Sequence, residues 1–231
     1  MEEKYVKFYY GVMGSGKTLD LLIAAYNKEK AGKKVVIVKS VTDSKAGNKI
    51  QTRFGSQERT VDLVINKYES FVKYFKIWKE KGIDYIYVDE AQFLTKEQIK
   101  ELVYLSYRYG IEVVCYGLIN KFNLELFEGS SILIQMVDFE KLQKSSVCEL
   151  CGEEAKVNAR YKDGKIEISG DSIVIDGTSS YEYKPLCMHC YIKEVSNIPG
   201  NMFEDIIRRD SELNNQEDYN NESKPKTLTK K

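Results

Sequence analysis

The 231-residue chain lacks the features of a membrane protein, a secreted protein or a dedicated nucleic-acid-binding protein. It carries 35 lysines and arginines and 35 aspartates and glutamates, so it has no net charge with which to attract DNA or an anionic membrane. No run of about 18 apolar residues is present, which argues against a membrane-spanning helix. The first residues, Met-Glu-Glu-Lys, show neither the basic nor the apolar region of a signal peptide. We therefore expect a cytoplasmic protein that binds neither nucleic acid nor a membrane directly.

Cysteine occurs only five times, and in a reducing compartment this favours metal ligands or buried thiols over disulfide bonds. Four of the five form two C-x-x-C pairs: Cys148, Cys151, Cys187 and Cys190. Two such pairs can supply the four thiolates of a closed, structural Zn²⁺ site. His189, the only histidine, could replace Cys190, although the regular spacing favours the cysteine. The fifth cysteine, Cys115, lies in an apolar run and is predicted to be buried.

The most specific motif lies near the N-terminus, between an apolar stretch and an amphipathic one. Residues 4–10 are expected to form a buried strand, and residues 18–31 a helix that ends at Gly32. Between them runs a segment with the spacing of a phosphate-binding loop. Its residues are Gly11, Val12, Met13, Gly14, Ser15, Gly16, Lys17 and Thr18. The backbone N–H groups would bind phosphate, Lys17 would reach the outer phosphates, and Thr18 would bind Mg²⁺.

Strands and helices alternate from this loop to about Lys141. Apolar runs predict strands over residues 35–38, 61–65, 83–88 and 111–116, and helical spacing predicts helices over 68–81 and 95–109. Loops are expected over residues 39–56 and 117–131. In the first of these helices the apolar and aromatic residues are expected to pack on the sheet: Tyr68, Phe71, Val72, Phe75 and Trp78. Such an order indicates an α/β fold with a parallel sheet.

The second helix carries its own start and stop signals. Thr95 is a predicted N-cap, Gln98 stands at the capping-box position, and Gly110 ends the helix. Asp89 and Glu90 follow the preceding strand, at the edge of the sheet where ligands bind. Neighbouring residues on an extended backbone point in opposite directions, so Asp89 would face Mg²⁺ and Glu90 the attacking group. A carboxylate in that position can accept the proton of a hydroxyl or of water.

The composition changes near Lys141, where glycines, cysteines and short alternating strands such as 165–168 replace the α/β pattern. We expect three parts: a nucleotide-binding core over 1–142, a zinc-binding lobe over 143–195 and a tail over 196–231. Within the tail, residues 203–209 could form one or two helical turns. The polar sequence from Ser211 onward is expected to be disordered.

Taken together, these motifs resemble the zinc-containing thymidine kinases of the RecA-like type, from about residue 5 to residue 193. Three features occur in the same order: the loop at 11–18, Val-Asp-Glu-Ala-Gln-Phe-Leu at 88–94, and the two cysteine pairs. The resemblance implies a P-loop, RecA-like core with a small zinc-binding "lasso" domain at its C-terminal side. It implies transfer of the γ-phosphoryl group of ATP to the 5′-hydroxyl of thymidine, and also of deoxyuridine, in nucleotide salvage for DNA synthesis. The products would be dTMP, or dUMP from deoxyuridine, and ADP.

The resemblance also assigns roles to residues. Thr18 would help to bind Mg²⁺, Asp89 would act on the ion through water, and Glu90 matches the catalytic base. The ATP site would comprise residues 11–18 with Asp89, Glu90, Ala91 and Gln92. The nucleoside site would comprise Met13, Phe93, Phe122, Phe127, Asn158 and Tyr183, or Tyr181 if the count starts from Gly177. The family further implies a homotetramer that is inhibited by dTTP in the thymidine site.

Three positions depart from the family pattern. Lys45 follows Asp43 where the family has arginine, and a lysine cannot grip phosphate in two-pronged fashion. Ile119 stands in place of an acidic residue. Asn158 stands where the family has a threonine near the thymine methyl group, and the larger amide can form a hydrogen bond and reduce the space for that methyl. The residues therefore predict a pyrimidine deoxynucleoside as substrate more firmly than they separate thymidine from deoxyuridine.

Two other classes of protein share part of the pattern. A phosphate-binding loop with Asp89-Glu90-Ala91-Gln92 is also typical of helicase-type ATPases, in which the glutamate activates water. Those enzymes generally combine two RecA-like domains, whereas this chain has room for one. A non-catalytic nucleotide-binding or zinc-ribbon adaptor would have no use for the carboxylate pair. Dependence of ADP formation on a nucleoside separates the three.

Overall fold

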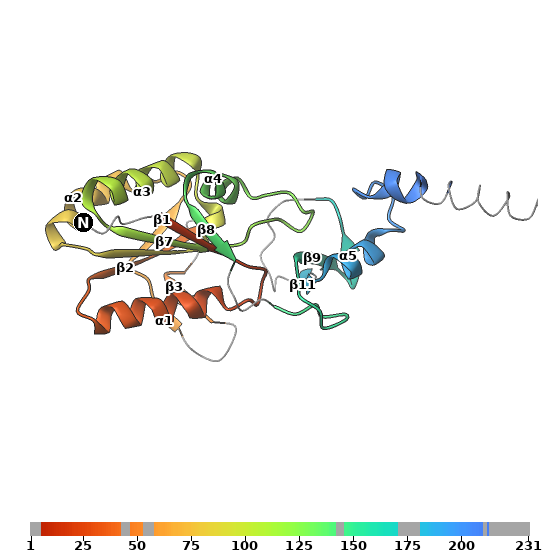
Figure 1. Ribbon diagram of the computed structural model, residues 1–231, viewed down its shortest axis with the longest axis horizontal. Coiled ribbons are helices and arrows are strands. Elements are labelled where there is room, and N and C mark those ends of the chain that lie inside the picture. Colours follow the sequence, from red (N-terminus) through yellow and green to blue (C-terminus); the bar gives the residue numbers. More distant parts are fainter. Residues whose placement is uncertain are drawn as a thin grey trace, which may run out of the picture.

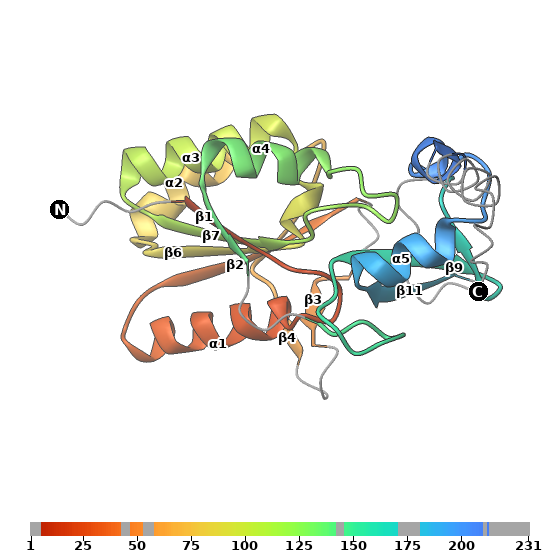
Figure 2. The same cartoon turned by 45° about the vertical axis from the view of Figure 1, so that its right-hand side comes forward.

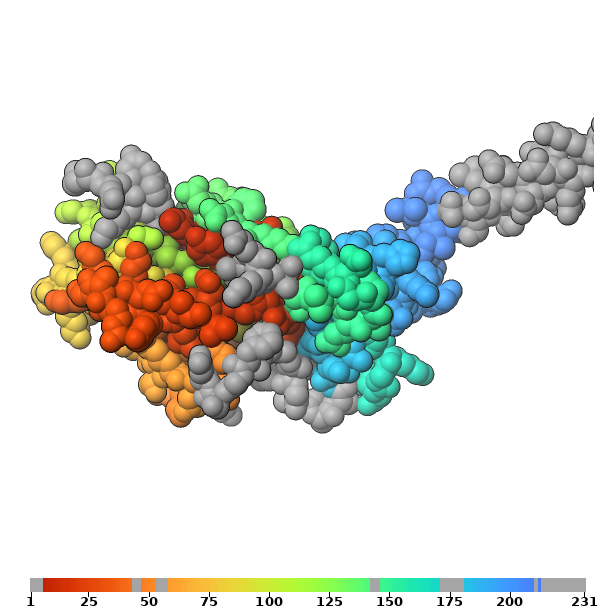
Figure 3. All heavy atoms as spheres, turned by 60° about the horizontal axis from the view of Figure 1, so that its bottom comes forward, coloured from red at the N-terminus to blue at the C-terminus, as the bar shows by residue number. Residues whose placement is uncertain are grey.

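Figure 1 shows the computed structural model of the chain, which describes residues 6–42, 47–52, 58–141, 146–170, 181–209 and 212. An α/β core comes first along the chain, and a small lobe lies against one end of it (Figures 1 and 2). In the space-filling view, the first part of the lobe meets the N-terminal segment of the core (Figure 3). None of the helices in the described ranges combines the length and the apolar character needed to cross a bilayer.

The core is a six-stranded sheet in the order β5-β2-β6-β7-β1-β8, in which all neighbouring strands are parallel. The strands are β1 (Val6–Tyr10), β2 (Val35–Val41), β5 (Leu63–Asn66), β6 (Tyr85–Asp89), β7 (Glu112–Gly117) and β8 (Asp138–Lys141). Helix α1 (Lys17–Lys30) covers one face of the sheet. The opposite face carries α2 (Val72–Lys81), α3 (Lys96–Tyr109) and α4 (Glu128–Met136) (Figure 1). The predicted parallel α/β core is confirmed.

The strands predicted over residues 35–38, 83–88 and 111–116 are interior strands of this sheet, whereas the strand predicted over 61–65 corresponds to the edge strand β5. All five residues of β6 are buried, and β2 lies between β5 and β6. Both faces of such a strand are covered by helices, which explains why its apolar residues do not alternate with polar ones. Cys115 lies on β7 with no exposed surface, as predicted. Its pKa is raised to about 12 by burial, which keeps the thiol protonated.

The start of α3 also follows the local sequence. Thr95 Oγ1 accepts a hydrogen bond from Gln98 N, and the Gln98 side chain accepts one from Thr95 N, so that both partners of the capping box are present. Gly110 ends the helix in the left-handed conformation, with φ 65°. Both signals lie within a few residues of the helix ends that they determine.

Several expected elements have different bounds. Helix α2 begins at Val72 rather than at residue 68. Tyr68 and Val72 are 85% and 55% exposed instead of packing on the sheet. The Asn66 side chain accepts a hydrogen bond from Tyr68 N, and this turn replaces the first helical turn. The predicted loop at 39–56 is also wrong in part. Strand β2 continues to Val41, and β3 (Lys49–Gln51) pairs with β4 (Glu58–Thr60) in a hairpin.

The loop predicted over 117–131 ends earlier than expected, because α4 begins at Glu128 and β8 follows it. The segment Glu-Gly-Ser-Ser is a weak helix start in isolation. Gly129 packs so closely on residues 91–94, a segment distant in the sequence, that a Cβ atom there would lie 2.6 Å from Leu94 O and 2.7 Å from Gln92 O. Tertiary packing, which local sequence does not reveal, therefore sets the position of α4.

The lobe is a three-stranded antiparallel sheet with one helix. It comprises β9 (Val157–Lys162), β10 (Lys165–Glu167), β11 (Tyr181–Leu186) and α5 (Met188–Val195). Residues 204–209 are helical, in agreement with the turns predicted over 203–209. Four positions discussed above lie outside the described residues: Asp43, Lys45, Gly177 and Ser211. The predictions that concern them, including the disorder of nearly all of the tail, therefore stay predictions.

Candidate active site

The glycine-rich loop connects β1 directly to α1. Gly14 and Gly16 have φ angles of 74° and 82°, which side chains other than that of glycine rarely adopt. At Gly11 a Cβ atom would collide with the Ser15 hydroxyl. Helix α1 begins at Lys17, immediately after the loop. The strand, the loop and the helix N-terminus therefore have the arrangement that binds phosphate groups in other proteins.

Lys17 folds back over this loop. Its Nζ donates hydrogen bonds to Gly11 O at 3.0 Å and to Val12 O at 2.9 Å. These contacts hold the ammonium group beside the backbone that would surround a phosphate chain. The cation therefore lies at the loop rather than in bulk solvent. A triphosphate bound by the loop would need a positive charge in that position.

The two predicted Mg²⁺ ligands are in direct contact. Thr18 Oγ1 donates a hydrogen bond of 3.1 Å to Oδ2 of Asp89, which is only 4% exposed. Burial and the nearby charge of Glu90 raise the pKa of Asp89 above its ordinary value, and the hydrogen bond from Thr18 opposes this shift. A hydroxyl and a carboxylate are oxygen donors of the kind that Mg²⁺ prefers, so the pair fits such an ion.

The backbone conformation of Glu90, just after β6, differs from the one that the sequence predicts. Its backbone is left-handed, with φ 55° and ψ 38°, so the expected alternation of an extended chain is wrong at this residue. A residue other than glycine in this conformation costs on the order of 1 kcal/mol or more, and such strain is concentrated at functional sites. The turn, rather than strand alternation, sets the direction of the Glu90 carboxylate relative to Asp89.

Gln92 holds the Glu90 side chain in place. It lies in the short helix η1 (Ala91–Phe93) and is 3% exposed. Its Nε2 donates a hydrogen bond of 2.6 Å to Glu90 Oε2, and its Oε1 accepts one of 3.1 Å from Leu118 N. The amide therefore connects the carboxylate to the loop that follows β7.

The predicted nucleoside-site residues fall into contacting groups. Phe93 and Phe127 meet edge to face, with ring centroids 5.8 Å apart. Met13 N donates a hydrogen bond of 2.7 Å to Asn158 Oδ1, which connects the phosphate-binding loop to the lobe. Phe122 is 3% exposed and lies under a residue of the lobe that the sequence did not single out, Arg160. The Arg160 guanidinium carbon is 3.6 Å from the centre of the Phe122 ring.

Tyr181 and Tyr183 both lie on β11, two residues apart, so their side chains leave the same face of the sheet. Tyr183 stands opposite Arg160 of β9, and Tyr181 stands opposite Lys162. The Arg160 guanidinium carbon is 5.6 Å from the Tyr181 ring centre. Both tyrosines therefore share the face of β9 that carries Arg160, and the choice between them stays open.

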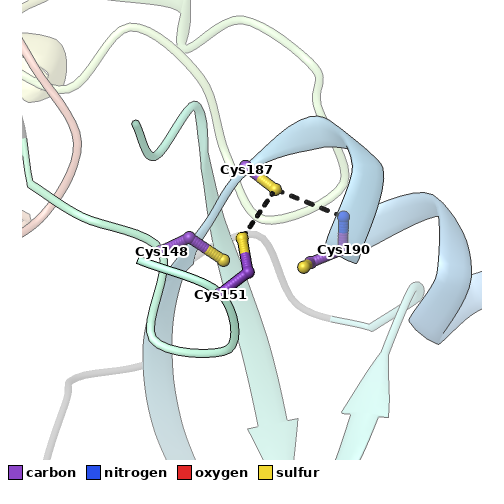
Figure 4. A group of neighbouring side chains, drawn as sticks. All are labelled: Cys148, Cys151, Cys187 and Cys190. Atoms are coloured by element: carbon purple, nitrogen blue, oxygen red, sulfur yellow. Dashed lines mark hydrogen bonds between the residues drawn. The ribbon is translucent and has the colours of Figure 1, made fainter. Parts of the chain in front are cut away.

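Figure 4 shows the four cysteines of the lobe converging on one point. Their sulfur atoms all lie within 4.8 Å of one another, and the sulfurs of Cys151 and Cys187 are 3.6 Å apart. A tetrahedral zinc ion with Zn–S bonds of about 2.3 Å requires sulfurs about 3.8 Å apart, so the cluster can hold zinc. His189 is exposed and is not part of the cluster, whereas Cys190 is.

Arg160 is the functional candidate that sequence reasoning missed. It is 1% exposed, and it lies between the lobe and Phe122 of the core. An arginine on a short strand is ordinarily predicted to be exposed to solvent, because arginine is rarely fully buried. The one available signal was its spacing from Asn158, which places both side chains on the same face of β9.

Comparison with known proteins identifies one family. A family model described as thymidine kinase matches residues 4–191. The thymidine kinase of Lactiplantibacillus plantarum is 34% identical over 187 residues, which cover 80% of this chain and 93% of that protein. The thymidine kinase of Streptococcus gordonii is 34% identical over 195 residues, which cover 84% and 97% of the two chains. The thymidine kinase of Francisella tularensis subsp. holarctica is 35% identical over 178 residues, covering 76% and 88%.

The matched region includes the phosphate-binding loop, the Asp89–Glu90 pair and all four clustered cysteines. The chain therefore belongs to the thymidine kinase family.

Proposed function

We propose that this protein transfers the γ-phosphoryl group of ATP to the 5′-hydroxyl of thymidine, giving dTMP and ADP, and that it also accepts deoxyuridine. The observation that carries the proposal is the contact between Thr18 and Asp89, with Glu90 held beside it by Gln92. A phosphate-binding loop, a cation-binding oxygen pair and a positioned carboxylate thus meet at one edge of the sheet. The names of the relatives support thymidine as the acceptor.

The residues of the loop would bind ATP. Backbone N–H groups of residues 11–18 and the N-terminus of α1 would hold the phosphates, and Lys17 would turn from the loop carbonyls toward the outer phosphates. Thr18 and Asp89 would hold Mg²⁺, which neutralises phosphate charge when it is bound. Asp89, Glu90, Ala91 and Gln92 would complete this side of the ATP site.

Glu90 would act as the catalytic base. As the 5′-hydroxyl oxygen attacks the γ-phosphorus, Glu90 would accept the hydroxyl proton, and ADP would leave with the electron pair of the broken P–O bond. Gln92 donates to one carboxylate oxygen of Glu90, which orients the group and leaves the other oxygen for the substrate. Positioning of this kind is a large part of catalysis in phosphoryl transfer.

The nucleoside would lie between the core and the lobe. Phe93, Phe122 and Phe127 would pack around the base, with Met13 and Asn158 at the junction with the lobe and Tyr183 or Tyr181 on β11. The lobe over 143–195 would act as the lasso, stapled at its base by zinc on the four cysteines. From the family resemblance we also propose a cytoplasmic homotetramer that is inhibited by dTTP in the thymidine site.

An acceptor-dependence assay tests this function. The purified protein is incubated with ATP and Mg²⁺, with thymidine, deoxyuridine, single-stranded DNA or no addition, and ADP is measured. We expect ADP only with a nucleoside, and dTMP in equal amount with thymidine. Stimulation by DNA alone would instead identify a helicase-type ATPase and would contradict the proposal. Negligible turnover under every condition would favour a nucleotide-binding adaptor.

A further inference from the structure

Strand β9 separates the interior of the lobe from its junction with the core. Three side chains on one face, Val157, Ala159 and Tyr161, pack in the apolar cluster that includes three of the four clustered cysteines. Asn158 and Arg160 leave the opposite face. Both contact the core, Asn158 at the phosphate-binding loop and Arg160 at Phe122. This second face of β9 is therefore the surface by which the lobe holds the core.

Arg160 makes an ion pair, a hydrogen bond and a cation–π contact. Its Nε lies 2.9 Å from Glu167 Oε2 on the neighbouring strand β10, and one terminal nitrogen donates a hydrogen bond of 3.0 Å to Ser169 O. Its guanidinium group lies over Phe122 with a carbon-to-centroid distance of 3.6 Å. A buried cation is tolerated only with such partners, and a planar guanidinium can stack on a ring in a way that an ammonium group cannot.

The lobe grips Phe122 at a second point. Tyr191 on α5 donates a hydrogen bond of 3.3 Å from its hydroxyl to Phe122 O. Tyr191 directly follows Cys190, and Cys187 is the N-cap of the same helix. The helix next to the cysteine cluster therefore reaches the same residue as Arg160. One contact fixes the ring of Phe122 and the other fixes its backbone.

Phe122 lies within a loop over residues 118–127 that also contacts the catalytic side of the core. Leu118 N, at its start, donates to Gln92 Oε1, and Phe127, at its end, packs against Phe93. The loop is thus fixed to the core at both ends and to the lobe in the middle. The middle contact is therefore the one through which the lobe can influence the position of the loop.

We propose that Arg160 is a positioning residue for the nucleoside: it holds Phe122, and with it the loop 118–127, in the geometry that binds the base. The inference rests on the proposed function. Arg160 contacts Glu167 and Ser169 in the lobe and Phe122 in the loop 118–127. Its loss should therefore weaken nucleoside binding and leave ATP binding unchanged. Loss of a residue that served only to stabilise the lobe would not weaken nucleoside binding while leaving ATP binding unchanged.

Steady-state kinetics of Arg160→Lys test the inference. Lysine keeps a positive charge near Glu167 but loses the planar stack on Phe122. We expect the KM for thymidine to rise about tenfold, as the loss of a desolvated cation–π contact predicts, with the KM for ATP and the zinc content unchanged. Lys165→Gln is the matched control, because it removes a positive charge from an exposed position on β10 and should change neither KM.

A double-mutant cycle with Phe122→Leu makes the test independent of general damage to the lobe. If Arg160 acts through the Phe122 ring, Arg160→Lys should raise the thymidine KM little further in the Phe122→Leu background. Additive effects, an unchanged thymidine KM, or equal increases in both KM values with a lower melting temperature would each overturn the inference. Absence of nucleoside-dependent ADP formation by the wild-type protein would overturn the proposed function itself, and the inference with it.

Discussion

The Thr18 hydroxyl donates a 3.1 Å hydrogen bond to the carboxylate of Asp89, a residue 71 positions later in the sequence. The contact joins the N-terminus of α1 to the carboxyl end of β6. Parallel strands bring these two ends to the same edge of the sheet, so the phosphate-binding loop and the acidic pair become one site. Since Glu90 and Gln92 continue from Asp89, this contact also brings the proposed base next to the phosphate loop.

Glu90→Gln should lower the turnover number by about a hundredfold or more and leave the affinity for ATP nearly unchanged. The amide preserves the size of the side chain but cannot accept the proton of the 5′-hydroxyl. Turnover is measured with thymidine at saturation, and ATP affinity by calorimetry in the absence of nucleoside. Turnover close to that of the wild-type protein would show that Glu90 is not the base.

Cys148→Ser should release zinc, raise the KM for thymidine and increase cleavage by protease within the lobe. Removing one of four thiolates opens a closed structural site, whose metal stabilises the surrounding fold. The helix α5 would lose its anchor, and with it the Tyr191 contact to Phe122. Zinc is measured by atomic absorption and cleavage by mass spectrometry.

Cys115→Ala is the matched control for that experiment. Cys115 is buried in β7 and is not part of the cysteine cluster, so its substitution should leave the zinc content unchanged. If the Cys148 variant kept a full equivalent of zinc and the thymidine affinity of the wild-type protein, the four-cysteine site would be wrong.

Gly129→Ala should destabilise the protein by about 1–3 kcal/mol, because the added methyl group would meet carbonyl oxygens of η1 and the residue after it at 2.6–2.7 Å. Those carbonyls belong to Gln92 and Leu94, and Gln92 orients Glu90, so turnover should fall as well. Urea denaturation measures the stability. Ser131→Ala, two residues later on the same helix, should stay within about 0.5 kcal/mol of the wild-type protein; a similar loss in both variants would refute the packing argument.

How far the sequence predicts this molecule depends on the range of the interactions involved. The α3 cap at Thr95 and the turns of the phosphate-binding loop are local, and both follow from neighbouring residues. The start of α4 depends on the close approach of Gly129 to another segment, so its helix was missed. The burial of Arg160 depends on a ring in a different domain, and no local pattern distinguishes it from a solvated arginine.

The same division applies to Glu90. Its identity as a carboxylate beside Asp89 follows from the motif, but the left-handed turn that directs its side chain was not predicted. Gln92 donates to the Glu90 carboxylate and accepts from Leu118 N, so the loop after β7 helps to orient that side chain. Sequence motifs therefore identified the candidate chemical groups, and packing determined how those groups are oriented.

Asn158 is the position where we expect this chain to differ most from its relatives in base selection. Met13 N donates a hydrogen bond to Asn158 Oδ1. The other polar atom of this side-chain amide is therefore Nδ2, which is a donor. Nδ2 is buried and, among the described residues, has no hydrogen-bond partner. A buried donor without a partner costs free energy, so a carbonyl oxygen of the base is a favourable occupant for that position. The amide also takes up space that a thymine methyl group would use.

Asn158→Thr should therefore raise the ratio of kcat/KM for thymidine to kcat/KM for deoxyuridine by about three- to tenfold, the range expected for one methyl group in an apolar pocket. Threonine is smaller, so it enlarges the space for the methyl group, and it removes the amide donor that serves both substrates equally. The absolute kcat/KM for deoxyuridine should fall for that reason. An unchanged ratio would show that Asn158 acts only through its hydrogen bond to Met13, as a connection between the lobe and the phosphate-binding loop.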